Sequence, residues 1–383
     1  MGFISLPLIL VVCAEGIYGA ITPLPAGNAG IAAQYPNDIG ISGNGAVVFA
    51  DDFEGYASAA NLSSRWNGGV YHYADLVTSG AFVGKSLRFR NPQQSAELSN
   101  TVDRLVSPEL DVLFLRYYTK FDASFNATGS SHNGCSVQAS YAVNGQATPG
   151  IPANGYNKFL ANWECWRDQL SEPSPGRMNT YVYHPEQRDV WGDHFFPTGV
   201  VLPWDRVPGD FGPDFVSRPD ITPQLNRWYC VEFMVRANTP GLRDGRIAAW
   251  LDGALIADFP NLRLRDIDTL NIDRFGVSSH IKSNTNNETY MYYDNVVAAT
   301  SYIGPRSSGS PVKPVAACGA VRVGKKVTAV FRDISGRTVC RQPVEWKGEK
   351  SLMPANHTLP NRLYLVEVMG ETETVMLKKV VLR

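Results

Sequence analysis

The 383-residue sequence has almost no net charge, no closely spaced pair of cysteines and no long apolar run beyond its first twenty residues. Its 35 basic residues balance 36 acidic ones, which argues against nucleic acid as the main partner. No later stretch approaches the roughly 18 apolar residues of a membrane-spanning helix. No two cysteines have the C-x-x-C spacing of a zinc or redox site. We therefore expect a globular protein with no transmembrane segment, no nucleic-acid partner and no organic cofactor.

The first twenty residues are unlike the rest of the chain. Residues 3–13 (FISLPLILVVC) form an uncharged apolar run, and small residues follow it around Gly19. This pattern predicts a signal peptide over residues 1–20 and a secreted or cell-surface protein. No Lys or Arg precedes the run, so a buried N-terminal strand is the alternative.

Removal of this segment leaves five of the six cysteines, an odd number that requires at least one unpaired thiol or an intermolecular bond. These are Cys135, Cys165, Cys230, Cys318 and Cys340. Export permits disulfides, and Cys318–Cys340 is the most plausible pair because both residues fall in a short C-terminal unit.

Glycine (34 residues), proline (25) and aromatic residues (11%) are plentiful, which favours short strands joined by tight turns. Apolar and alternating runs occupy residues 113–121, 158–166, 227–235, 246–251 and 290–298. Asp252-Gly253 lies between two apolar runs and predicts a hairpin, because both turn positions need positive φ. The sequence thus predicts an all-β sandwich or barrel.

Composition also divides the chain. Residues 21–45 are small, polar and rich in Gly and Pro, as expected of a leader, and strand-like patterning runs from residue 46 to about 304. Residues 305–317 (PRSSGSPVKP at their start) have the composition of a linker. Residues 318–383 form a compact unit with expected strands near 327–333, 362–368 and 374–382.

Residues 46–304 resemble the concanavalin A-like jelly-roll superfamily, and within it the polysaccharide lyases. The segments that carry the resemblance are VVFADDFEGY (47–56), LFLRYYTKFDASF (113–125), RWYCVEFMVRANTPGLRDGRIAAWLDGALI (227–256) and YYDNVVAATSYIG (292–304). The third, with its strand, turn and W-x-D-G hairpin, is the most specific. The resemblance implies a jelly-roll β-sandwich followed by a small C-terminal β-sandwich, and a carbohydrate ligand.

The C-terminal unit resembles a type IX secretion sorting domain. The residues that carry this likeness are VFRDISGRTV (330–339), LPNRLYLVEV (359–368) and MLKKVVLR (376–383). Arg362 departs from the family pattern, which has glycine before the Tyr strand. The resemblance implies that export machinery is a partner of this unit.

Alternation along strands brings basic and aromatic side chains onto shared faces. The candidate substrate-binding residues on such faces are Arg116, Lys120, Arg177, Trp228, Arg236 and Lys282, joined by Tyr118, Tyr181, Tyr183 and His280. If these strands share the concave sheet, they form a basic, aromatic-lined groove for an anionic polysaccharide. Alternatively, some of them belong to the outer sheet, whose polar face meets water.

Cleavage of such a polymer by β-elimination requires a group that neutralises the uronate carboxylate, a base and an acid. The candidates for neutralisation are Arg116, Lys120 and Arg177. For proton transfer they are Tyr118, His132, Tyr181, Tyr183 and His280. Glycoside hydrolysis would instead need two carboxylates, and the E-x-D-x-x-E strand signature of jelly-roll glucanases is absent.

Residues 159–168 and 181–195 are rich in Trp, Tyr, His and charged side chains. We interpret them as a groove wall that contributes Trp163 and Arg167, although a packed loop at the sandwich edge is the alternative. His184, His194 and the nearby Asp189 and Asp193 match no metal-site spacing.

In the superfamily that the sequence resembles, the first and last strands pair and bring carboxylates together around structural calcium. Asp52, Glu54 and Asp294 are the corresponding candidates, since Ca²⁺ prefers hard oxygen ligands. Carboxylates that cap strand ends are the alternative.

Two functional hypotheses follow. The first is a secreted lyase that binds and cleaves an acidic polysaccharide. The second is a non-catalytic lectin-like or adhesion protein of the cell surface.

Overall fold

A computed structural model describes residues 22–69, 72–129, 131–141, 150–202, 205, 211–212, 214–282 and 286–307, together with the backbone of four strands between residues 326 and 381. The chain forms two compact units, Met1–Gly309 and Ser310–Arg383. The predicted signal peptide and most of the predicted linker lie outside the described residues. No helix among the described residues is long and apolar enough to cross a membrane.

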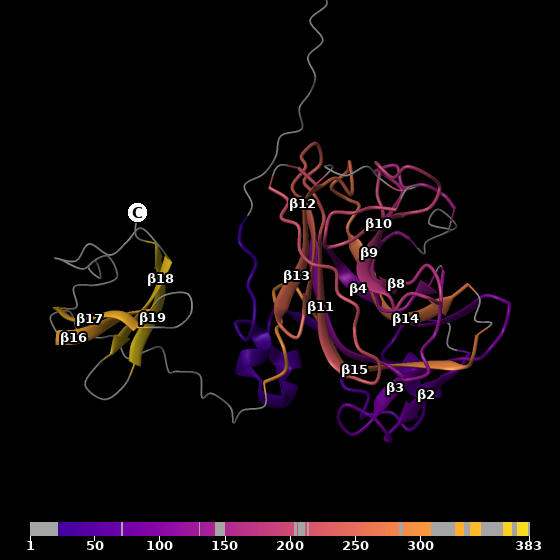
Figure 1. Ribbon diagram of the computed structural model, residues 1–383, viewed down its shortest axis with the longest axis horizontal. Coiled ribbons are helices and arrows are strands. Elements are labelled where there is room, and N and C mark those ends of the chain that lie inside the picture. Colours follow the sequence, from indigo (N-terminus) through magenta and orange to yellow (C-terminus); the bar gives the residue numbers. More distant parts are fainter. Residues whose placement is uncertain are drawn as a thin grey trace, which may run out of the picture. The chain divides into compact units, whose positions relative to one another are not determined.

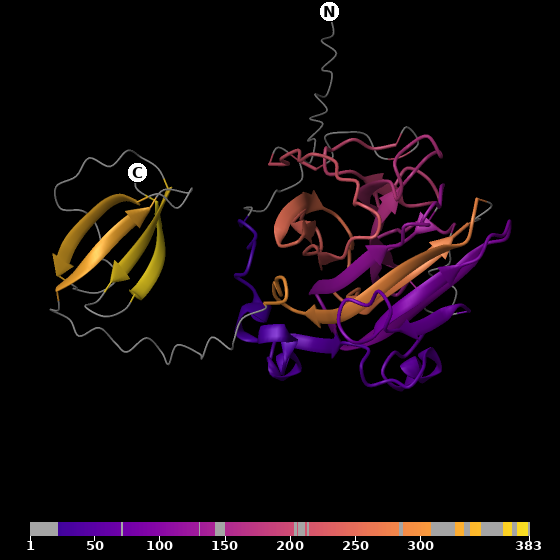
Figure 2. The same cartoon turned by 60° about the horizontal axis from the view of Figure 1, so that its bottom comes forward.

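The first unit consists of two antiparallel sheets packed face to face (Figures 1 and 2). We call the eight-stranded one the back sheet. Its order is β13 (Ala254–Leu262), β12 (Gly245–Leu251), β11 (Tyr229–Arg236), β5 (Val112–Phe121), β15 (Thr289–Ala299), β3 (Ser86–Asn91) and β2 (Ala74–Val77), and β1 (Val47–Asp51) also pairs with β15.

We call the seven-stranded one the groove sheet. Its order is β10 (Asp193–Phe195), β9 (Arg177–Tyr183), β8 (Phe159–Trp166), β7 (Cys135–Ala139), β14 (Ile272–Ile281) and β4 (Leu98–Leu110), and β6 (Ser131–His132) also pairs with β14. The all-β sandwich predicted from the sequence is confirmed.

The core between the sheets follows from the alternation of apolar residues. Leu115 on β5 and Phe233 on β11 point inward from the back sheet, and Trp163 on β8 and Val277 on β14 do so from the groove sheet. Each of the four is at most 1% exposed. Because alternate residues of a strand face opposite ways, the neighbours of these residues form the outer faces of the sandwich.

The hairpin predicted at Asp252-Gly253 joins β12 to β13. Asp252 has φ of 51° and Gly253 has φ of 81°, the left-handed backbone that a two-residue turn requires. The Asp252 carboxylate accepts the backbone N–H of Cys230, so the turn is also tied to β11.

Residues 22–45 are an integral part of the first unit, and their interpretation as a leader is wrong. They form three short 3-10 helices, η1 (Ile31–Gln34), η2 (Pro36–Asp38) and η3 (Ile41–Gly43), on the side of the back sheet away from the groove sheet (Figure 1). A fourth, η4 (Ala59–Ser64), follows β1. Ile31 and Ile41 are buried there against Phe114 and Trp250 in a second, smaller core. Their small and polar neighbours hid these few apolar anchors in the composition.

In the second unit the described strands are β16 (Lys326–Arg332), β17 (Thr338–Glu345), β18 (Leu363–Met369) and β19 (Thr374–Val381). They form one antiparallel sheet in the order β17-β16-β18-β19. The strands β16, β18 and β19 lie where the sequence predicts strands, and β17 is an additional one. The sorting-domain likeness stays a prediction. Cys318 lies outside the described residues, and Cys135, Cys165 and Cys230 are buried free thiols.

Candidate functional site

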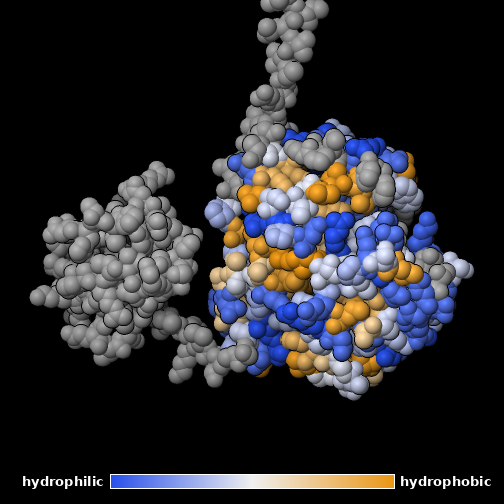
Figure 3. All heavy atoms as spheres, in the orientation of Figure 1, coloured by the Kyte–Doolittle hydropathy of each residue, from blue (hydrophilic) through white to orange (hydrophobic). Residues whose placement is uncertain are grey.

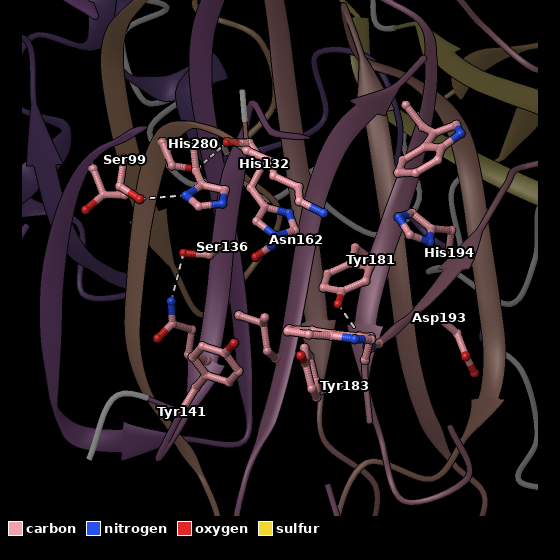
Figure 4. A pocket seen from close by; sticks show the side chains of 18 of the residues that line it. Ser99, His132, Ser136, Tyr141, Asn162, Tyr181, Tyr183, Asp193, His194 and His280 are labelled. Atoms are coloured by element: carbon pink, nitrogen blue, oxygen red, sulfur yellow. Dashed lines mark hydrogen bonds between the residues drawn. The ribbon is translucent and has the colours of Figure 1, made fainter. Parts of the chain in front are cut away.

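A groove of about 690 Å³ lies on the outer face of the groove sheet (Figure 4). It is bordered on one side by the segment after β9 and floored by alternate residues of six strands. Its described lining includes Glu97, Ser99, Asp103, His132, Ser136, Gln138, Tyr141, Asn162, Trp166, Tyr181, Tyr183, Asp189, Trp191, Asp193, His194, Asp205, His280 and Lys282.

Two histidines stack at one end of this groove. His132 on β6 and His280 on β14 are directly opposite in register, and their ring centroids are 5.2 Å apart. The Nδ1 atom of His280 lies 2.6 Å from Oγ of Ser99 on the neighbouring strand. Burial and the adjacent His132 lower the pKa of His280 to about 4, so this imidazole is neutral at neutral pH.

His132 has a carboxylate partner. Its Nδ1 atom lies 2.7 Å from Oε2 of Glu164, whose side chain is 1% exposed. Burial opposes the charged imidazolium, but the attraction and hydrogen bond of Glu164, with a further contribution from Glu97, raise the pKa of His132 above its usual value. Glu164 therefore fixes the orientation of this ring and directs its Nε2 atom away from the carboxylate.

Tyr181 lies beside this pair. It is directly opposite Asn162 on β8 and His194 on β10, and its ring centroid is 5.0 Å from that of His132. The hydroxyl oxygen accepts the backbone N–H of Gly192 at 2.9 Å, which leaves its own proton available to a ligand. Burial raises the pKa of Tyr181, so its phenol stays protonated.

Position 192 has no room for a side chain. A Cβ atom there would lie 2.7 Å from the carbonyl oxygen of Val182 and 3.0 Å from Cζ of Tyr181. The absence of a side chain therefore allows the backbone to approach the Tyr181 hydroxyl.

Aromatic rings line the groove on both sides of Tyr181. Tyr141 and Tyr183 pair with centroids 5.4 Å apart, two residues along the strands from Tyr181 (Figure 4). Trp166 packs on His194 at 4.5 Å. Such rings can pack against the apolar faces of sugars.

Two amide groups on the groove floor hold buried oxygen atoms without a hydrogen-bond partner among the described residues. They are Oδ1 of Asn162 and Oε1 of Gln138. Buried acceptors of this kind are destabilising unless a donor reaches them, and sugar hydroxyls supply such donors.

The structure brings together five of the residues predicted as site residues: His132, Tyr181, Tyr183, His280 and Lys282 all line the groove. The prediction that β5 and β9 share one concave sheet is wrong. β5 belongs to the back sheet and β9 to the groove sheet, so Tyr118 and Tyr181 lie on opposite sides of the sandwich.

Arg116, Tyr118 and Lys120 therefore form no groove. Arg116 is fully buried and makes a bidentate ion pair with Asp38 of the covering N-terminal segment. The hydroxyl of Tyr118 accepts the backbone N–H of Arg306, and Lys120 donates to the carbonyl oxygen of Gly80.

Trp228 and Arg236 belong to the same outer face of the back sheet. The indole N–H of Trp228 donates to the carbonyl oxygen of Gly80, and Arg236 donates to that of Asp244. Neither residue lines the groove.

Three further candidates contact other parts of the protein and do not line the groove. Trp163 points into the core and stacks on Phe233, because its position on β8 has the parity of the core residues. Arg167 is buried and donates to the carbonyl oxygens of Leu170 and Glu172. Arg177 pairs with Asp220 and is not among the groove-lining residues.

The groove is not basic. Among the described residues that line it, Lys282 is the only lysine or arginine, whereas Glu97, Asp103, Asp189, Asp193 and Asp205 contribute carboxylates. Asp193 pairs with His184 and Asp205 with His194. The expected cluster of cations does not form, because Arg116, Lys120 and Arg236 lie on the back sheet.

The carboxylates proposed for calcium have protein partners, and the calcium site stays a prediction. Asp294 is buried and accepts hydrogen bonds from Ser86, Val83 and Asn295, while Asp52 is exposed and Glu54 accepts the backbone N–H of Lys85. Within the described ranges, no group of three His, Cys, Asp or Glu residues is arranged to hold a metal. Both oxygens of Asp294 accept hydrogen bonds, Oδ2 from Ser86 and Val83 and Oδ1 from Asn295.

Sequence reasoning missed Glu164, Asn162 and Gln138, and it weighed His194 only as a metal ligand. The signal for the first two was present: alternation along β8 puts Asn162 and Glu164 on one face and Trp163 on the other. The prediction of Trp163 as a binding residue assigned the core-facing side of β8 to the groove.

No family model and no curated protein matches this chain. Solved structures with a similar arrangement include the alginate lyase Aly36B, with 18% identity and a TM-score of 0.47 over 67% of this chain and 98% of that one. An alginate lyase from Aplysia kurodai has 14% identity and a TM-score of 0.48, over 66% of this chain and 99% of its own. An endo-β-1,4-glucuronan lyase from Trichoderma reesei has 14% identity and a TM-score of 0.43, over 67% and 96%. At these identities the likeness concerns the arrangement of the sheets alone.

Proposed function

We propose that this protein binds a polysaccharide in the groove and cleaves it by β-elimination beside a uronate unit. The observation that carries the proposal is the contact between His132, held by buried Glu164, and Tyr181, whose hydroxyl is fixed by Gly192. A base and an acid side by side in an open groove are what an elimination needs.

His132 is the proposed base. With Nδ1 directed to Glu164, its Nε2 atom can take the proton from the sugar carbon next to the carboxylate. The raised pKa of His132 makes it a stronger base than His280, which is neutral and stacked behind it.

Tyr181 is the proposed acid. As the C–H bond breaks, its electron pair forms the new carbon–carbon double bond and the bond to the glycosidic oxygen is broken. Tyr181 gives its proton to that oxygen, and the proton held by His132 can later restore the phenol. The products are an unsaturated uronate end and a new reducing end, and no water is consumed.

The uronate carboxylate must be stabilised while the neighbouring carbon loses its proton. Asn162, directly opposite Tyr181, offers an amide for this role, and Lys282 offers a charge at the same end as His280. The unpartnered oxygens of Asn162 and Gln138 are suited to accept sugar hydroxyls.

The test is a panel of polysaccharides with and without uronate, in which new ultraviolet absorbance reports the unsaturated product. Absorbance that appears with a uronate polymer and not with a neutral one supports the proposal. Release of saturated ends without new absorbance would replace elimination by hydrolysis.

The alternative is a lectin-like protein that binds the polymer without cleaving it. The orphaned amide oxygens and the aromatic rings of the groove favour glycan binding under either hypothesis. Binding without any product, by absorbance or reducing ends, would establish this alternative.

We also propose that the protein is exported, with the C-terminal unit as a signal for export machinery. Support comes from the apolar run in residues 1–20 and from the sorting-domain residues near the C-terminus. Deletion of residues 318–383 should retain the protein inside the producing cell, and secretion that survives this deletion would contradict the proposal.

A further inference from the structure

The two ends of the groove carry different side chains. This difference bears on which sugars the bound polymer contains. At the end with His132 and His280, Lys282 follows the last residue of β14 and lines the groove together with His280. Glu164 and Glu97 act on His132, so the charges here offset one another. This end can accommodate a single sugar carboxylate, and its described residues lack the excess of cations that a closely spaced row of carboxylates would need.

The other end is aromatic and acidic. Trp191 is 52% exposed in the groove wall, and its ring lies beside Gly150, whose N–H donates to the hydroxyl of Tyr183 at 3.4 Å. Tyr141 packs on Tyr183. The exposed carboxylate of Asp189 lines the groove two residues before Trp191.

Hydrogen bonds of Gln187 hold the segment after β9, which forms the groove wall, in place beside Asp189 and Trp191. The Gln187 side chain donates to the carbonyl oxygens of Asp189 and Trp191 and accepts the N–H groups of Ala153 and His184. The next residue after Trp191 is Gly192, which binds the hydroxyl of Tyr181. The aromatic end is therefore preorganised and continuous with the proposed acid.

A chain of uronates alone would put a carboxylate on the ring that packs against Trp191, next to Asp189. Like charges that line the same groove repel, and the apolar indole cannot compensate the carboxylate. A neutral pyranose would instead present C–H groups to the indole and hydroxyl donors to Asp189 and to Oε1 of Gln138.

We infer that the polymer is a heteropolysaccharide whose uronates are separated by neutral sugars, with a neutral pyranose on Trp191 and a uronate between His132 and Tyr181. This inference rests on the proposed function and names the substrate class for the same groove.

The experiment compares three oligosaccharides of equal length that differ only in their carboxylates: all glucuronate, all glucose, and the two in alternation. A second set in the galacto configuration covers the other common stereochemistry. Titration calorimetry with Tyr181→Phe protein measures binding without cleavage. We expect the alternating oligosaccharide of one set to bind about tenfold more tightly than the all-uronate one, a difference of ~1.4 kcal/mol.

Two variants test whether Asp189 and Trp191 are the residues that discriminate between the oligosaccharides. Asp189→Asn should strengthen binding of the all-uronate oligosaccharide about threefold, and less at high salt. Trp191→Ala should weaken binding of the alternating and all-neutral oligosaccharides about tenfold. The matched controls are Asp168→Asn and Tyr156→Ala, which change exposed residues that do not line the groove, and both should bind as the parent does.

The outcomes separate the inference from the proposed function. All-uronate binding equal to or tighter than alternating binding, unchanged by Asp189→Asn, overturns the inference and leaves the lyase proposal intact. Binding of the alternating oligosaccharide without cleavage by the unmodified protein supports the neutral subsite and contradicts the lyase. Binding of none of them contradicts both.

Discussion

The rings of His132 and Tyr181 lie 5.0 Å apart, although they come from β6 and β9, which are not hydrogen-bonded to each other. Each ring is fixed by a second residue, His132 by Glu164 and Tyr181 by Gly192. The pair therefore offers two reactive groups whose positions do not depend on a bound ligand.

If Tyr181 transfers a proton, Tyr181→Phe should lower kcat by about 10²–10⁴-fold while binding stays nearly unchanged. The phenyl ring keeps the packing against His132 and His194, and only the hydroxyl is lost. Single-turnover assays and calorimetry measure the two quantities. Tyr156→Phe, at an exposed site, is the control. Full activity in Tyr181→Phe would remove it from the mechanism.

Glu164→Gln should change the pH dependence of cleavage. A base works only when deprotonated, so activity should rise as pH passes the pKa of His132. The substitution removes the attraction that raises this pKa and leaves the burial that lowers it, so the acidic limb should move to lower pH. It should also reduce kcat, because the ring loses its orienting partner. An acidic limb that does not move would assign it to another group.

Arg116 should matter for stability and not for glycan binding. Arg116→Met leaves the carboxylate of Asp38 without its partner and should lower the free energy of unfolding by ~3–5 kcal/mol, measured by urea denaturation. The double variant with Asp38→Asn should recover part of this loss. Arg88→Met, which breaks the more exposed pair with Asp75, should cost less than about 1 kcal/mol. Weaker glycan binding by folded Arg116→Met would contradict the assignment.

His280 should make stability depend on pH. Folding lowers its pKa from 6.5 to about 4, so the neutral ring stabilises the fold above pH 6.5 and this contribution is lost as pH falls towards about 4. His280→Asn should therefore lose less stability than the parent over this window in chemical denaturation. Parallel losses in the two proteins would show that His280 is not the titrating group.

The calcium site expected at Asp52, Glu54 and Asp294 can be tested by thermal melting. A cation that binds only the folded state would raise the melting temperature. If the three carboxylates hold a cation, the melting temperature should be higher with calcium than with chelator. Equal melting temperatures would leave them as carboxylates that cap strand ends.

Alternation was enough to predict the two faces of β5, β9 and β14, because side-chain direction in a strand is a local property. It could not predict which sheet a strand joins. The polar faces around Arg116 and His280 have similar patterns, but β5 pairs with β11 and β15, whereas β14 pairs with β4 and β7. Those pairings link residues far apart in the chain.

The sequence also could not predict which other segment of the chain covers each outer face of the sandwich. The face with Arg116 is closed by Ile31 and Ile41, from a segment whose composition suggested a leader. The face with His280 is left as a groove that mixes polar and aromatic side chains. Elsewhere too the surface mixes hydrophilic and hydrophobic residues, as on the face in Figure 3, so hydropathy alone does not distinguish the two faces.

The N-terminal segment and the residues that follow β15 are joined by backbone hydrogen bonds from Ile31 to Tyr302, from Ala32 to Ile303 and from Asn37 to Ser307. The same segment is tied to the back sheet, because Glu232 of β11 accepts the N–H groups of Ile303 and Gly304 and Tyr118 of β5 accepts that of Arg306. A pull on the chain beyond Ser307 would therefore be shared between residues 31–37 and the middle of the back sheet.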